Sequence, residues 1–116
     1  MDIKHIILAG ESAGGHLAIA VSFLAALRGF RQADGIMSNY PNLSKDANRF
    51  FPSTLMTLDD VITSQSIRKM FSACFMQNGG SPEVNPILTI TNAPLALLRM
   101  LPQLRVTACE ADSLRD

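Results

Sequence analysis

The feature that most constrains this chain is a glycine-rich hexapeptide between two apolar stretches. Gly10-Glu11-Ser12-Ala13-Gly14-Gly15 follows a short apolar run, Ile3 to Ala9, and precedes a longer one, Leu17 to Arg28. A short run of consecutive apolar residues is typical of a strand covered on both faces, and the longer run has apolar residues at helical spacing. The hexapeptide therefore predicts a tight turn from a buried strand into a largely buried helix, which Gly29 ends as a C-terminal cap.

The rest of the chain continues the alternation of strands and helices. Further strands are predicted over Gly35 to Tyr40 and over Leu104 to Cys109, and helices over Asp59 to Met76 and over Pro94 to Leu101. A strand, a helix and a strand in close succession form a right-handed crossover unit of a parallel sheet. The order predicts an α/β fold with a parallel sheet.

The composition excludes several classes of protein. Hydrophobic residues make up 47% of the 116 residues and charged residues only 17%, which is below the ~25% of an ordinary soluble domain. Ten basic residues balance ten acidic ones, so nothing favours nucleic acid as a partner. The longest apolar stretch, Leu17 to Leu27, is too short to span a bilayer. Such an apolar chain either packs unusually well or is part of something larger.

The two cysteines carry no recognisable chemistry. Cys74 and Cys109 do not have the spacing of metal ligands, and two cysteines cannot form the disulfide framework of a small secreted domain. We expect both to be buried thiols, and we expect no metal site.

The hexapeptide contains the pattern G-x-S-x-G, which at a strand-to-helix junction is typical of a nucleophile elbow. Ser12 would lie on a strained turn that exposes its hydroxyl above the sheet edge. Gly10 and Gly14 would avoid clashes between strand and helix, and the Ala13 N–H would stabilise an oxyanion. The alternative is a helix start that binds phosphate or merely turns. Neither the Walker motif nor the dinucleotide fingerprint fits these glycines.

A serine nucleophile needs a base, and the base needs an orienting carboxylate. Asp112 follows the third predicted strand, at the same carboxyl edge as Ser12, so it is the candidate acid; the alternative is a turn aspartate. The chain has only two histidines. His5 precedes the first strand and His16 lies in the first turn of the helix, so both are interpreted as structural or surface residues. The base then lies beyond Asp116 or does not exist.

Three segments resemble the hormone-sensitive lipase family of α/β-hydrolases. The elbow of that family commonly reads Gly-Asp-Ser-Ala-Gly-Gly, from which Glu11 is a conservative departure. Ala33 to Pro41 resembles the family's next strand, which ends in Tyr-Pro. Leu101 to Asp116 resembles the strand and loop that deliver the catalytic aspartate, with Asp112 at the acid and Ser113 in place of the usual proline.

The resemblance implies a partial α/β-hydrolase fold, made of a portion of the parallel sheet with its nucleophile elbow and a helical, cap-like excursion. Residues 1–116 would form an incomplete catalytic domain that lacks the upstream His-Gly-Gly oxyanion motif and the downstream histidine. Residues 44–80 would supply part of a cap. Five apolar side chains there either line the acyl pocket or belong to the core: Phe50, Phe51, Met56, Leu58 and Phe75.

The implied function is that of a lipase or esterase of lipid metabolism, a serine hydrolase that acts on acyl esters by a Ser-His-Asp mechanism. The substrate would be an apolar ester, with no cofactor, and the isolated chain would be inactive. The resemblance implies a cytoplasmic parent protein without a transmembrane segment, and leaves contact with a lipid surface or droplet open. Two alternatives also stay open: a receptor-like, ligand-binding relative without the histidine, and an inactive piece that misfolds alone.

Overall fold

The computed structural model describes residues 4–44, 70, 73–74, 85–110 and 112. The chain divides into two compact units, Met1–Asn42 with Ala93–Thr107, and Leu43–Asn92 with Ala108–Asp116. The helix predicted over Asp59 to Met76 lies almost entirely outside the described residues, as does the cap segment 44–80 with its five candidate pocket residues.

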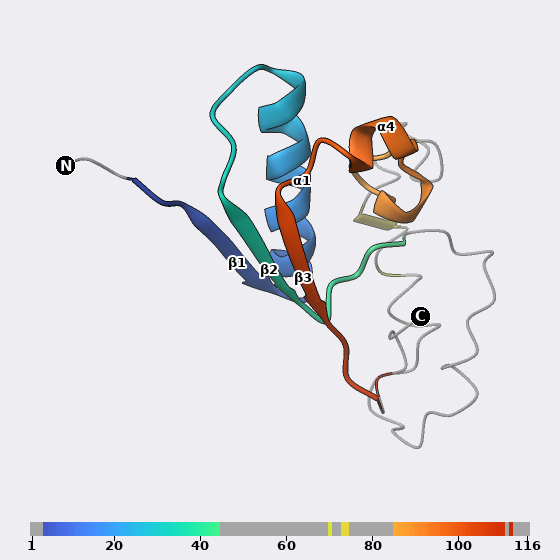
Figure 1. Ribbon diagram of the computed structural model, residues 1–116. Helices are drawn as coiled ribbons and strands as arrows, with labels where there is room; N and C mark the ends of the chain where they lie inside the picture. Colours follow the sequence, from blue (N-terminus) through green and yellow to red (C-terminus); the bar gives the residue numbers. More distant parts are fainter. Residues whose placement is uncertain (1–3, 45–69, 71–72, 75–84, 111, 113–116) are drawn as a thin grey trace. The chain divides into compact units, whose positions relative to one another are not determined.

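The first unit contains a parallel sheet of three strands in the order β1-β2-β3 (Figure 1). The strands are β1 (Ile7–Glu11), β2 (Gly35–Asn39) and β3 (Gln103–Thr107). The register pairs Glu11 with Asn39 and Asn39 with Thr107, so the carboxyl ends of all three strands lie in line. The predicted parallel arrangement is confirmed, although β1 begins later than Ile3 and β3 ends before Cys109.

Helix α1 (Ala13–Leu27) packs on β1 and β2 and covers one face of this part of the sheet (Figure 1). Its fully buried side chains include Ile19 and Phe23, and Ile36 of β2, on which α1 packs, is 2% exposed. The expectation of a largely buried helix is only half right, because Leu17 is 59% exposed and Val21 is 51% exposed.

Gly29 lies just past Arg28, the C-cap of α1, where the sequence predicts a capping glycine. Gly29 has a φ of +67°, in the left-handed region that favours glycine. Its amide donates to the Ala26 carbonyl at 3.3 Å, and the Phe30 amide donates to the Ala25 carbonyl at 2.9 Å. This pair of hydrogen bonds is a Schellman motif, which satisfies two carbonyls that the helix leaves unpaired.

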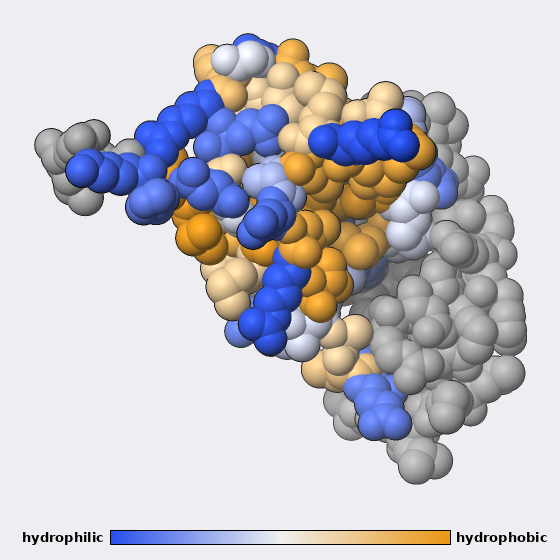
Figure 2. All heavy atoms as spheres, viewed as in Figure 1, coloured by the Kyte–Doolittle hydropathy of each residue, from blue (hydrophilic) through white to orange (hydrophobic). Residues whose placement is uncertain are grey.

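The other side of the sheet is open among the described residues and carries both apolar and polar side chains. Every residue of β3 is exposed, and β1 alternates between exposed and half-buried. On this side Ile7 is 56% exposed and Met37 is 44% exposed, and the polar Gln103 and Arg105 lie beside them in register. Figure 2 shows hydrophobic side chains at this surface among the charged ones. The prediction of strands covered on both faces is therefore wrong for the described part of the chain.

The remaining elements are short. Helix α4 (Leu95–Leu98) belongs to the first unit and is shorter than the predicted helix from Pro94 to Leu101. The second unit contains the 3-10 helix η1 (Ile90–Asn92), preceded by a turn in which the Asn85 side chain accepts from the Ile87 amide at 2.9 Å. Within the described residues, no helix has both the length and the apolar character needed to cross a membrane.

Candidate active site

Ser12 is the single residue that joins β1 to α1. Strand β1 ends at Glu11 and the helix begins at Ala13. Ser12 has φ 51° and ψ −118°, and its carbonyl accepts from the His16 amide at 3.1 Å, which places it at the N-cap position. A serine at an N-cap ordinarily turns its hydroxyl back onto the helix amides. Ser12 makes no such capping hydrogen bond and is exposed. The predicted strained strand-turn-helix context is therefore present.

The glycines around Ser12 differ in how much space each leaves for a side chain. A Cβ on Gly10 would lie 2.3 Å from the Gly14 carbonyl carbon, a distance that no real side chain tolerates. A Cβ on Gly15 would lie 2.7 Å from the Ser38 hydroxyl. A Cβ on Gly14 would meet no described atom within 4 Å. The prediction that Gly10 and Gly14 are the crowded pair is therefore wrong, because Gly10 and Gly15 are the glycines at the close approach of strand and helix.

Strand β2 holds the turn from its other side. The Ser12 amide donates to the Asn39 carbonyl at 2.9 Å, which continues the sheet ladder one residue past β1. Beneath the first turn of α1, Ser38 is fully buried, and its hydroxyl has no hydrogen-bond partner in the described part of the chain. Sequence reasoning included Gly15 in the elbow but missed its packing role, and it missed Ser38 altogether, because their contact joins residues on two separate elements.

The two histidines lie apart from the exposed face of the turn. His16 is 6% exposed, and its Nδ1 lies 2.8 Å from the Asn42 carbonyl oxygen, which ties the first turn of α1 to the segment after β2. His5 is exposed and precedes β1, at the end of the sheet opposite to Ser12. Both positions agree with the structural or surface interpretation.

The candidate acid belongs to the second unit. Asp112 is half-buried, and its amide donates to the Cys109 carbonyl at 3.3 Å, as in a turn that follows a strand end. Asp112 is therefore described with its own neighbours, and the structure does not place it relative to Ser12.

The predicted burial of the cysteines is wrong, because Cys74 and Cys109 are both free and exposed.

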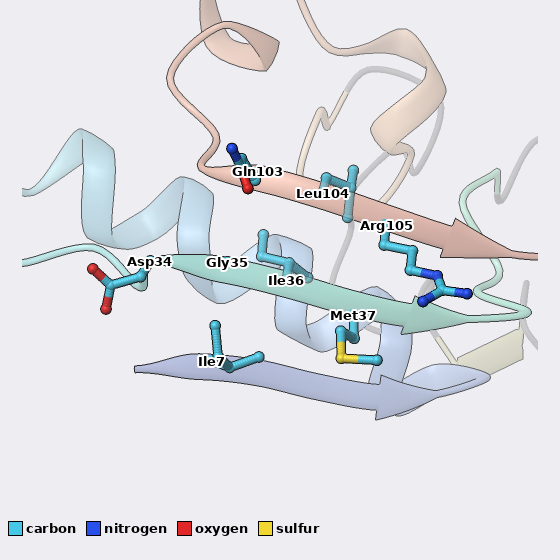
Figure 3. A pocket seen from close by; sticks show the side chains of 8 residues that line it. All are labelled: Ile7, Asp34, Gly35, Ile36, Met37, Gln103, Leu104 and Arg105. Atoms are coloured by element: carbon cyan, nitrogen blue, oxygen red, sulfur yellow. The ribbon is translucent and has the colours of Figure 1, made fainter. Parts of the chain in front are cut away.

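A groove of about 530 Å³ crosses the open face of the sheet, but it lies away from Ser12 (Figure 3). Its lining begins at the first residue of each strand, so it opens at the amino ends while Ser12 lies past the carboxyl end of β1. It is lined by Ile7, Asp34, Gly35, Ile36, Met37, Gln103, Leu104 and Arg105.

In the described ranges no three histidine, cysteine or acidic side chains gather into a group that could hold a metal ion.

Comparison with known proteins gives matches at the levels of family and sequence. A family model for the alpha/beta hydrolase fold matches residues 1–116. Hormone-sensitive lipase of Mus musculus is 44% identical over 64 residues, which cover 55% of this chain and 8% of that protein. Hormone-sensitive lipase of Homo sapiens is 42% identical over 66 residues, which cover 55% of this chain and 6% of that protein. The matched part thus spans a small fraction of these relatives.

Solved structures match nearly the whole chain. Brefeldin A esterase, a bacterial homologue of human hormone-sensitive lipase, superposes with a TM-score of 0.76 at 30% identity, over 95% of this chain and 32% of its own. Carboxyl esterase 2 of Tuber melanosporum has a TM-score of 0.80 at 19% identity, over 99% of this chain and 37% of its own, which shows a common fold. The chain spans about a third of each of these structures.

Proposed function

Because the chain belongs to the alpha/beta hydrolase fold family, in the branch of the hormone-sensitive lipases, we propose that the protein that carries it hydrolyses carboxylic esters with Ser12 as nucleophile. The observation that carries the proposal is the backbone of Ser12. Its positive φ and the absence of a capping hydrogen bond leave an exposed hydroxyl at the carboxyl end of the sheet. Open parallel sheets place their sites at this edge.

In the proposed reaction, the Ser12 Oγ attacks the ester carbonyl carbon and gives its proton to an imidazole. The oxyanion that forms is stabilised by the Ala13 amide, which as the first helical residue has no acceptor within α1. The imidazole then protonates the leaving alcohol, an acyl-enzyme remains, and a water molecule activated by the same imidazole releases the acid. Asp112 orients the imidazole through a hydrogen bond.

The imidazole in this scheme belongs to a histidine outside residues 1–116. His16 is buried and its Nδ1 faces the Asn42 carbonyl, and His5 lies at the opposite end of the sheet. Neither suits proton transfer at Ser12, because a general base must reach the proton that it abstracts. The 116-residue chain is thus proposed to be an incomplete catalytic domain, with residues 44–80 in its cap and an apolar acyl ester as its substrate.

The names of the similar proteins support the reaction class. They are lipases and esterases, which act on carboxylic esters, and none of the proposed steps needs a cofactor. The second candidate is a ligand-binding protein that keeps the pocket without turnover. The absence of a suitably placed histidine among the described residues favours it, and the same experiment separates the two.

The test is reaction of the natural, full-length protein with a fluorophosphonate probe. We expect labelling at Ser12, loss of labelling in Ser12→Ala, and hydrolysis of p-nitrophenyl esters that falls to background in the same variant. Ser22→Ala is the matched control, because the Ser22 hydroxyl is buried and donates to the Ala18 carbonyl at 3.1 Å. Unchanged labelling of Ser12→Ala would remove Ser12 from the mechanism, and a folded parent protein that is neither labelled nor active on esters would favour the ligand-binding candidate.

A further inference from the structure

Two non-glycine residues of the described chain have a positive φ, and they occupy equivalent places on neighbouring strands. Ser12 follows the last residue of β1, and Tyr40, with φ 36°, follows the last residue of β2. The residues that precede them, Glu11 and Asn39, are register partners. The two unusual backbones therefore lie side by side at the carboxyl edge of the sheet.

Hydrogen bonds hold Tyr40 close to the nucleophile turn. The Ser12 amide donates at 2.9 Å to the carbonyl of Asn39, which belongs to the same peptide group as the Tyr40 nitrogen. That nitrogen donates in turn to the carbonyl of Thr107 at the end of β3. The Asn39–Tyr40 peptide thus bridges the elbow and the third strand, and neighbouring strands of a sheet lie only ~4.8 Å apart.

A tyrosine is an unfavourable choice for this backbone. A bulky side chain with a positive φ is a steric outlier, whereas glycine adopts the conformation freely and asparagine tolerates it. The residue before a proline is further restricted toward extended conformations, and Pro41 follows Tyr40. Burial does not account for the side chain either, since Tyr40 is 38% exposed. Strain of this kind is stored where the side chain has a use.

We propose that Tyr40 is a specificity-determining residue of the ester site, whose ring contacts the apolar substituent of the ester bound at Ser12. The proposal rests on the proposed function of Ser12. The left-handed backbone turns the chain away from β2 directly beside the reacting carbonyl. An aromatic ring there offers a large apolar surface with few rotatable bonds, which discriminates between short and long substituents.

The test compares three variants of the full-length protein, Tyr40→Gly, Tyr40→Asn and Tyr40→Phe. Glycine and asparagine keep the positive φ without the ring, and phenylalanine keeps the ring without the hydroxyl. Two ratios of kcat/KM are measured, octanoate over acetate among p-nitrophenyl esters, and octyl over methyl among acetate esters. We expect at least one ratio to fall about 10-fold or more in the glycine and asparagine variants and to stay within twofold of the parent in Tyr40→Phe.

Several outcomes would overturn the proposal. One is that both kcat/KM ratios stay unchanged in Tyr40→Gly and Tyr40→Asn while the Tm is retained. That result would mean that Tyr40 has only a structural role in the turn. Another is a loss in Tyr40→Phe equal to that in Tyr40→Gly. Phe30→Ala is the matched control, because Phe30 is an exposed aromatic residue after α1, at the other end of the sheet. Fluorophosphonate labelling of each variant is measured as well, because the small probe reports the reactivity of Ser12. Retained labelling with unchanged ratios overturns only the role of Tyr40, whereas absence of labelling in the parent protein overturns the proposed function.

Discussion

Gly10 and Gly14 flank Ser12 at equal distances in the sequence, yet only Gly10 is needed for space. Its missing side chain lets the backbone of β1 approach the Gly14–Gly15 peptide, which no other residue type allows at 2.3 Å. Gly14 lies inside α1 with open surroundings. The pattern G-x-S-x-G thus contains one glycine required by packing, and a second required one, Gly15, lies just outside it.

This difference predicts opposite effects of two alanine substitutions on stability. Gly10→Ala is expected to lower the free energy of unfolding by about 3 kcal/mol or more, because backbone atoms must move. Gly14→Ala is expected to leave it unchanged or raise it by up to about 1 kcal/mol, because alanine restricts the unfolded chain and favours the helix. Denaturant unfolding of the two variants measures both. Equal destabilisation by the two substitutions would contradict the structure.

Asp112 is the residue whose proposed role has a distinctive kinetic signature. Asp112→Asn is expected to lower kcat of the full-length protein by about 10⁴-fold with little change in KM, because an amide holds the imidazole in the wrong tautomer. Glu110→Gln is the control, since Glu110 is a nearby acidic residue of the same unit. A loss confined to the Glu110 variant would transfer the role of acid to that residue.

Among the elements, the end of α1 was the most predictable from the sequence. Gly29, directly after Arg28, predicts a C-terminal cap, and the observed hydrogen bonds of Gly29 and Phe30 confirm it. A cap of this kind depends only on neighbours in the chain, so local sequence is sufficient to predict it.

The cap gives a prediction at the scale of the element. Gly29→Ala is expected to lower the free energy of unfolding by about 1–2 kcal/mol, because the left-handed backbone of Gly29 is unfavourable for a residue with a Cβ. Gly29→Asn is expected to lose less, because asparagine visits this conformation. Thermal unfolding of the two variants gives the comparison, and an alanine variant as stable as the asparagine variant would argue against the observed cap.

Features that depend on distant parts of the chain were harder to predict. The parallel order of β1, β2 and β3 follows from the alternation of strands and helices, and the hydrolase fold and family follow from the elbow and the segments around Tyr40 and Asp112. The exposed side of α1 at Leu17 and Val21 does not. An apolar residue shows that a side chain can be buried, but only the packing partner decides whether it is.

At the scale of the whole molecule, α1 covers one face of β1 and β2, while β3 and apolar side chains such as Ile7 and Met37 on the opposite face are exposed among the described residues. Exposed apolar surface of this extent usually marks a place where other protein packs. The low charge of the sequence, 17%, is explained in the same way. It agrees with the proposal that these strands and this helix belong to an incomplete catalytic domain, and the chain spans about a third of the similar structures.

The isolated 116-residue chain is accordingly expected to be inactive as an esterase. Neither His5 nor His16 is placed to deprotonate Ser12, and without a base the hydroxyl is a weak nucleophile. Hydrolysis of p-nitrophenyl acetate by the purified chain, measured against its own Ser12→Ala variant, is the test, with the full-length protein as the positive control. Robust turnover that disappears with Ser12 would show that the chain contains its own base.

The register of the sheet also has a consequence for how the molecule folds. The strands β1 and β2 are joined by α1 alone, so their pairing closes a short loop, whereas β3 joins β2 only after the long segment between them has been brought back. Contacts between nearby residues form faster than contacts across long loops. The turn at Ser12 then forms early, with β1, α1 and β2, and the strand that leads to Asp112 docks late. Assembly of Ser12 with Asp112, the two residues proposed to be catalytic, is therefore expected among the last events of folding.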